Sequence, residues 1–119
     1  MKKQTVLKYQ IPVEDNFSIE LPKGYKILTV QAQSIYVGNM LANPYEETAM
    51  LWVLVNPEEK EKETVQFLLA GTGHEIEMEK YPLGMEYINS FQMKDGKLVF
   101  HLFFVETISV RAMIKAFGI

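Results

Sequence analysis

The sequence predicts a mainly β domain, a small antiparallel sandwich or partly open barrel of about seven strands with a short C-terminal helix. Three observations carry this prediction. Apolar residues recur mostly with a period of two, which is typical of strands. Turn residues separate the alternating segments. Residues 107–117 alone change to a helical period.

The first three predicted strands follow from alternation. In residues 6–11 the apolar side chains share one face until a proline ends the strand. Residues 17–21 alternate cleanly, and the proline and glycine of 22–25 have the type II turn pattern. In residues 27–33, Leu28 and every second residue after it are expected to face inward.

Four more strands are predicted along the rest of the chain. Residues 51–55 and 65–70 are apolar almost throughout, as expected for central strands that are covered on both faces. Residues 87–93 and 98–105 flank an Asp-Gly pair, which is a strong signal for a hairpin.

Two segments interrupt the strand pattern. Residues 34–49 are predicted to form a long insertion loop, with a short helix starting at Asn43. This loop contains Tyr36 and Tyr45, so it is either a packing cover for its own domain or an exposed interface patch. Residues 107–117 are predicted to form a helix that covers an open face or edge of a sheet, either its own, which is favoured, or a partner's.

Composition indicates one globular domain spanning residues 1–119, 48% apolar and 23% charged. The absence of cysteine excludes disulfides and thiolate metal sites. With no signal-peptide pattern and no apolar window long enough for a membrane span, a cytoplasmic protein without a membrane partner is expected. The net charge of −3 and the scattered lysines argue against nucleic acid as a partner.

The motif Gly71-Thr72-Gly73-His74 directly follows an apolar strand. Glycines at a strand end let the backbone turn sharply and expose N–H groups to an anion, and histidine changes its charge near neutral pH. The motif lacks the third glycine and the lysine of known phosphate loops. It therefore predicts either a small anion-binding corner or a tight turn.

Several other side chains are candidates for the same site. The candidate ligand-binding residues are Gly71, Thr72, Gly73, His74, Trp52 and Arg111, with His101, Tyr36 and Tyr45 as secondary candidates. An aromatic ring would stack on a base, and Arg111 or lysines of a neighbouring subunit would supply positive charge. His101 is either a packing residue or a partner of His74. No metal or cofactor is expected, because no ligand spacing of a known metal motif is present.

The segments that carry a family resemblance are 8–13, 21–24, 27–31, 51–57, 71–74, 87–92 and 98–103. In this order and spacing the chain resembles a family of small proteins of tailed phages and prophages that carries no agreed activity. The resemblance implies that Gly-Thr-Gly-His is a signature of that family. Residues 34–49 and 107–119 depart from it, since the family usually has a short turn at the first and ends before the second.

Two function classes follow, and neither is enzymatic, because no catalytic constellation stands out. In the first, favoured by the resemblance, the protein sequesters a small phosphorylated, nucleotide-like ligand and counters host defence. In the second, it is an interaction module that inhibits a host protein or serves as a phage accessory protein. The second would use residues 34–49, the C-terminal helix or an open sheet edge. A homo-oligomer in the host cytoplasm is expected.

Overall fold

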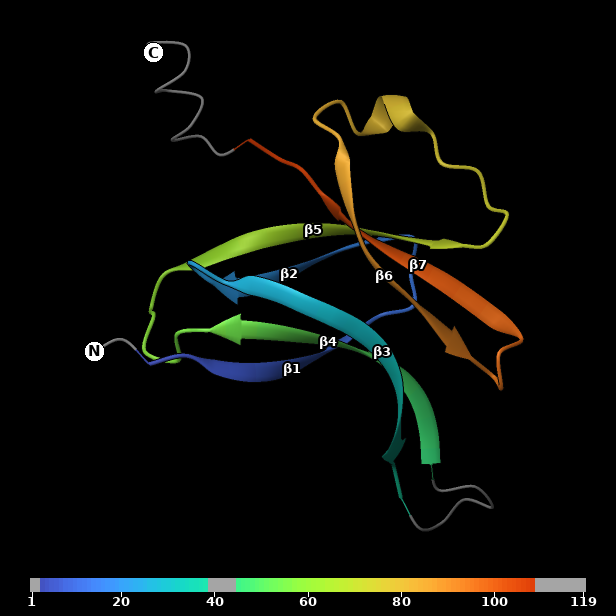
Figure 1. The fold of residues 1–119 in the computed structure, drawn as a ribbon, viewed down its shortest axis with the longest axis horizontal. Coiled ribbons are helices and arrows are strands. Elements are labelled where there is room, and N and C mark those ends of the chain that lie inside the picture. Colours follow the sequence, from blue (N-terminus) through green and yellow to red (C-terminus); the bar gives the residue numbers. More distant parts are fainter. Residues whose placement is uncertain (1–2, 39–44, 109–119) are drawn as a thin grey trace.

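The computed structural model describes residues 3–38 and 45–108 of the chain. The elements in these residues are β1 (Thr5–Ile11), β2 (Asn16–Pro22), β3 (Lys26–Tyr36), β4 (Tyr45–Val55), β5 (Lys62–Gly71), the 3-10 turn η1 (Met78–Lys80), β6 (Met85–Met93) and β7 (Leu98–Val105). The strands form two antiparallel sheets, ordered β1-β4-β3 and β2-β5-β7-β6 (Figure 1). The prediction of a mainly β, sandwich-like fold is confirmed.

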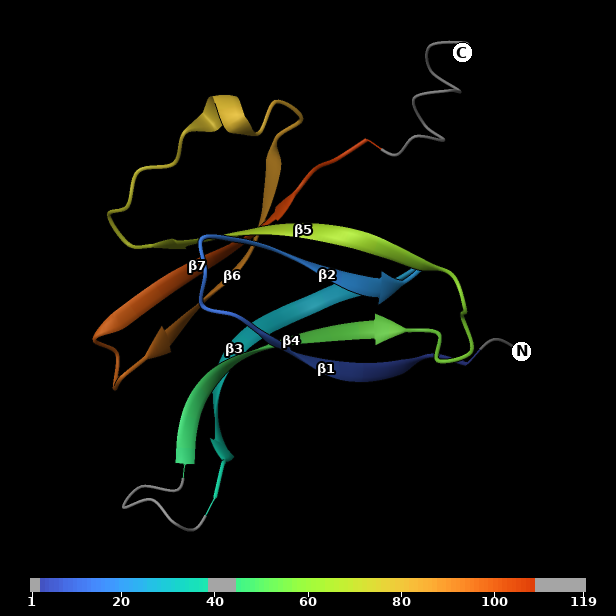
Figure 2. The same ribbon diagram turned by 180° about the vertical axis from the view of Figure 1, so that it is seen from behind.

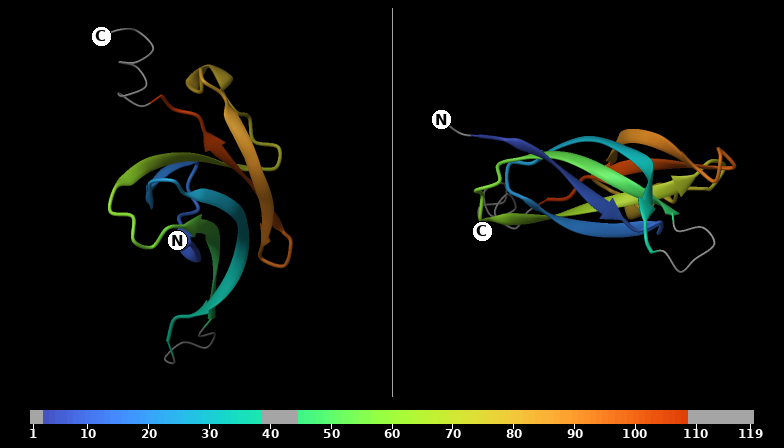
Figure 3. Two further views of the ribbon diagram at one scale, coloured as in Figure 1. Left: turned by 60° about the vertical axis from the view of Figure 1, so that its left-hand side comes forward. Right: turned by 90° about the horizontal axis from the view of Figure 1, so that it is seen from below.

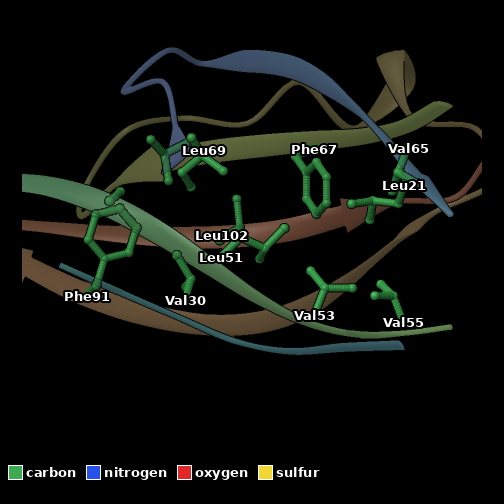
Figure 4. Packing of buried hydrophobic residues seen from close by; sticks show 12 residues of the cluster. Leu21, Val30, Leu51, Val53, Val55, Val65, Phe67, Leu69, Phe91 and Leu102 are labelled. Atoms are coloured by element: carbon green, nitrogen blue, oxygen red, sulfur yellow. The ribbon is translucent and has the colours of Figure 1, made fainter. Parts of the chain in front are cut away.

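The two sheets face each other across one apolar core. Seen from behind, β2 and β5 run on one side of this core and β1 and β4 on the other (Figure 2). The predicted central strands supply most of it, because alternate residues of β4 and β5 point to the same side. The most deeply buried side chains include Leu51, Val53 and Val55 of β4, Phe67 and Leu69 of β5, and Leu102 of β7 (Figure 4).

Both predicted tight turns are confirmed. At the end of β2 the Tyr25 N–H donates to the Pro22 carbonyl over 3.1 Å, and Gly24 has a φ of 87°, as a type II turn requires. Between β6 and β7 the Asp-Gly segment forms the hairpin, and Asp95 itself adopts a φ of 56°.

The prediction of an insertion loop at residues 34–49 is wrong for residues 34–36 and 45–49, which lie in strands, and residues 39–44 lie outside the described part of the chain. β3 continues to Tyr36 and β4 begins at Tyr45, and these two residues pair across the ladder. The predicted helix start at Asn43 lies outside the described residues, and Tyr45 and Glu46, which would belong to its first turn, lie in a strand. Long-range pairing between two strands overrides the local helix signal here. The resulting β3–β4 hairpin reaches beyond the sandwich (Figure 3).

The predicted C-terminal helix falls mainly outside the described residues, and Arg111 falls there with it. Thr107 and Ile108, which would begin that helix, are described and have no helical structure. In the part of the chain that the structure describes, the only helical element is η1. No helix there is long and apolar enough to cross a membrane.

The sandwich does not close into a barrel. β3 is an edge strand of the first sheet and β6 an edge strand of the second, and they run close to each other without a shared ladder. The Asn89 amide of β6 donates to the Thr29 hydroxyl of β3 over 3.1 Å. Just after the end of β6, the Lys94 N–H donates to the carboxylate of Glu47 in β4 over 2.6 Å. These contacts join the sheets at one end of what we call the seam, the boundary between β3 and β6.

Candidate functional site

Some of the backbone N–H groups of the Gly71–His74 turn are hydrogen-bonded within the protein. The His74 N–H donates to the Gly71 carbonyl over 3.0 Å, and Gly73 has a φ of 89°. The Thr72 N–H donates to the Val99 carbonyl of β7 over 3.1 Å. Two of the four amides predicted to cradle an anion are therefore occupied within the protein.

The imidazole of His74 folds back over its own turn. A Cβ added at Gly71 would lie 2.9 Å from Cε1 and 3.0 Å from Nδ1 of that ring. Real Cβ atoms essentially never approach so closely. The close approach of the His74 ring thus explains why residue 71 is a glycine. The left-handed backbone at residue 73 explains the second glycine.

The surroundings of His74 are mostly acidic. A depression of about 290 Å³ beside it is also lined by Asp15, Glu75, Glu77 and Lys80. The Lys80 ammonium bonds to the Glu77 carboxylate over 3.0 Å, and this hydrogen bond raises the pKa of Lys80. Three carboxylates against one already paired lysine make this surface unfavourable for a phosphate.

His101 is bonded to two hydroxyls. Its Nε2 lies 2.8 Å from the Thr72 hydroxyl, and its Nδ1 lies 3.2 Å from the Tyr87 hydroxyl. One set of donors satisfies every contact: Tyr87 O–H donates to Nδ1, Nε2–H donates to Thr72, and the Thr72 O–H points to the Val99 carbonyl at 3.5 Å. The partner of His101 is therefore Thr72 of the turn, and the network ties that turn to β6.

The aromatic candidates lie on other surfaces. Trp52 alternates with the buried Leu51 and Val53, so its side chain points away from the second sheet, which carries the turn. Lys8 Nζ lies 5.6 Å from the centre of its ring, and its Nε1 is buried without a hydrogen-bond partner among the described residues. It is not placed to stack on a base held by the turn.

Tyr36 and Tyr45 lie at the far end of the β3–β4 hairpin, away from the turn (Figure 1). Their rings form an edge-to-face pair with centroids 5.6 Å apart, and both side chains are more than half exposed, at 59% and 58%. This segment was predicted to be either a packing cover or an exposed patch, and the two rings are exposed.

The seam is a candidate site that sequence reasoning missed. Above the Asn89–Thr29 contact the two strands leave a groove of about 580 Å³. Its apolar and aromatic lining consists of Tyr25, Ile27, Leu28, Tyr87, Ile88 and Phe104. The register of β3 shifts at Leu28 and that of β6 at Ile88, so each strand carries a bulge beside the groove. Leu28, predicted to face inward, is instead 42% exposed because of this bulge.

Tyr25 stands between this groove and a neighbouring depression of about 660 Å³. Burial raises the pKa of the Tyr25 phenol, and the charges of Glu63 and Glu106 raise it further. Glu63 lines both depressions. The groove is therefore an apolar surface with a negative rim around a half-buried tyrosine.

A family model described as a domain of unknown function (DUF7352) matches residues 2–111. The chain belongs to the DUF7352 family. This match spans almost the whole chain, residues 34–49 included. No curated protein and no solved structure matches the chain.

In this DUF7352 domain, residues 3–38 and 45–108 contain no group of three or more histidine, aspartate or glutamate side chains placed to hold a metal ion. Glu75, Glu77 and Glu79 follow His74 at alternate positions, and Glu77 forms an ion pair with Lys80. What the described residues offer chemically is an apolar groove between two strand edges, a hydroxyl–imidazole network and an exposed tyrosine pair.

Proposed function

We propose that this DUF7352 domain is a non-enzymatic binding protein whose partner is another protein, contacted at the seam between β3 and β6. The observation that carries the proposal is a groove of about 580 Å³ with apolar walls, bordered by two strands that have no sheet neighbour on that side in the described part of the chain. Concave apolar surfaces and open sheet edges are both common places for recognition.

The exposure of the groove walls supports a protein partner. Leu28 of β3 is 42% exposed and Tyr87 of β6 is 51% exposed. Tyrosine is among the side chains that most often supply large parts of the binding free energy at the centre of a protein interface. The tyrosine pair at the end of the β3–β4 hairpin offers a second, separate contact.

The rival proposal is a small anionic, nucleotide-like ligand held by Gly71, Thr72, Gly73 and His74. It is less well supported, because two amides of that turn are already bonded and the charged residues that line the nearby depression are mainly carboxylates. The rings meant to stack on a base lie elsewhere. This ligand stays a prediction from the sequence.

Finer parts of the proposal rest on the family resemblance alone. A tailed-phage origin, a role against host defence, a host protein as partner, a homo-oligomer and a cytoplasmic location all stay predictions. Each is compatible with a protein-binding groove, and none is needed for it.

Photo-crosslinking in the cells that contain the protein tests the proposal. A photoreactive phenylalanine analogue replaces Tyr87 in the seam, His74 in the turn, or Glu20 as an exposed control on β2. We expect a discrete protein adduct from position 87 and none from position 20. Adducts from position 74 alone would contradict the proposal. So would native mass spectra of gently purified protein that show a small added mass, lost in the His74→Ala variant.

A further inference from the structure

We infer that the occupant of the seam is an extended peptide segment of the partner, which pairs with the edge of β6 or β3 as an added strand and carries a basic residue near Glu63 and Glu86. This inference rests on the proposed function and names the chemistry of the partner. Three features of the seam support it.

The first feature is unpaired backbone. Among residues 3–38 and 45–108, β6 pairs only with β7, and β3 pairs only with β4. In an antiparallel pair, alternate residues direct their N–H and C=O groups away from the partner strand. Within the described residues no backbone hydrogen bond crosses from β3 to β6. The edge groups of residues 26–28 and 86–88 are thus open to an incoming strand.

The second feature is the shape of the gap. The bulges at Leu28 and Ile88 each bend their strand, so the two edges meet at Thr29 and Asn89 and separate above that point. The groove residues of β3 and β6 all precede Thr29 and Asn89 in sequence, so the groove lies on one side of this contact, with Gly24 and Glu86 farthest from it along the two segments. Such a groove suits a segment that enters from one end with its backbone extended.

The third feature is charge. The charged side chains that line the groove are Lys26, Glu63 and Glu86, so carboxylates outnumber ammonium groups by two to one. Glu106 adds a further negative charge close to Tyr25. A partner strand with apolar side chains and one lysine or arginine near Glu86 complements this groove in both polarity and charge.

The opposite edges of the sandwich differ from the seam. β1 and β2 are also edge strands, but Pro12 directly follows β1 and Pro22 ends β2. Proline cannot donate to a ladder and is a common means of protecting sheet edges. The seam edges carry no proline, which favours them as the place for an added strand.

A random-peptide display library selected on the immobilised full chain tests the inference. Enriched peptides are then measured against four proteins: the wild type, Leu28→Asp, Glu86→Lys and the turn variant His74→Ala. Leu28 is already 42% exposed, so its aspartate variant is expected to fold, and a thermal melt checks this. Hydrogen exchange locates the bound peptide.

We expect enriched peptides with alternating apolar residues and a basic residue. Leu28→Asp should weaken them about tenfold or more, because it places a carboxylate in an apolar groove. Glu86→Lys should weaken basic peptides and favour acidic ones, and His74→Ala should leave the affinity unchanged. The amides of residues 26–28 or 86–88 should exchange more slowly with peptide bound.

Two results separate failure of this inference from failure of the proposed function. Seam crosslinks to a protein, together with enriched peptides that protect only the β3–β4 hairpin end, would overturn the added strand and leave a protein-binding function. Peptides whose binding is lost in His74→Ala and kept in Leu28→Asp would overturn both.

Discussion

The turn at the end of β5 and the seam between β3 and β6 differ in how far their polar groups are satisfied. In the turn, the amides of Thr72 and His74 are bonded internally, and the Thr72 hydroxyl is bonded to His101. At the seam, two strand edges pass each other with one side-chain hydrogen bond between them and a groove above it. The hydrogen bonds of the turn are largely internal, and this contrast is the basis of the proposal that a partner binds at the seam.

Tyr87 connects the two regions. Its hydroxyl bonds to His101, which bonds to Thr72, and its ring lines the seam. The turn therefore acts on the seam by holding one of its walls in place. The predictions below separate these roles, beginning with the largest expected effect.

Truncation of the Phe104 side chain in the seam should destabilise the fold far more than truncation of the His74 side chain in the turn. Phe104 lines the groove and packs edge-to-face on the buried Phe67, with centroids 6.4 Å apart. Because Phe104 is half-buried, Phe104→Ala should lower the free energy of unfolding by about 2–3 kcal/mol. His74→Ala, at an exposed site, should change it by less than about 0.5 kcal/mol. Urea unfolding measures both, and equal losses would contradict this division.

A charge on the seam wall should affect binding rather than stability. Leu28→Asp is expected to reduce affinity for a seam-binding peptide by about tenfold, equivalent to about 1.4 kcal/mol. Its melting temperature should stay close to that of the wild type, because the leucine is partly exposed. Calorimetric titration and a thermal melt measure the two effects. Unchanged affinity would show that the groove is not the contact.

The effect of an alanine at Gly71 should depend on the ring above it. In the wild type, Gly71→Ala brings a Cβ against the His74 imidazole and should cost about 0.5–1 kcal/mol. In the His74→Ala background the contact is gone, and the same substitution should be neutral or stabilising, because alanine reduces the entropy of the unfolded chain. A double-mutant cycle measures this coupling. Additive effects would mean that the ring does not lie over Gly71.

The smallest effect is expected at alkaline pH from Tyr25. The pKa of this phenol is raised in the folded protein, chiefly by burial and then by Glu63 and Glu106. The folded state thus holds its proton above a pH of about 10, where the unfolded chain loses it. The associated stability is complete below that pH and is lost as pH rises through the folded pKa. Tyr25→Phe should abolish this alkaline loss in pH-dependent urea unfolding, and an unchanged pH profile would contradict it.

Much of the fold followed from the sequence, and the site did not. The apolar run at residues 65–70 predicted a strand correctly, and the Asp-Gly pair at residue 95 predicted a hairpin correctly, because both signals are local. Residues 34–36 and 45–49 were misassigned because cross-strand pairing decides their structure. The seam depends on which edges meet in space, and alternation does not encode that. The sequence did hold one signal: the adjacent apolar pairs Ile27-Leu28 and Tyr87-Ile88 interrupt the alternation where the structure has bulges.

Amide hydrogen exchange of the free, full chain tests the central contrast most directly. We expect fast exchange at alternate amides within residues 26–28 and 86–88, which face the open seam, and slow exchange at Thr72 and His74, which are bonded internally. Slow exchange along both seam edges, with fast exchange at Thr72 and His74, would show that the edges are already paired and that the turn is the open site.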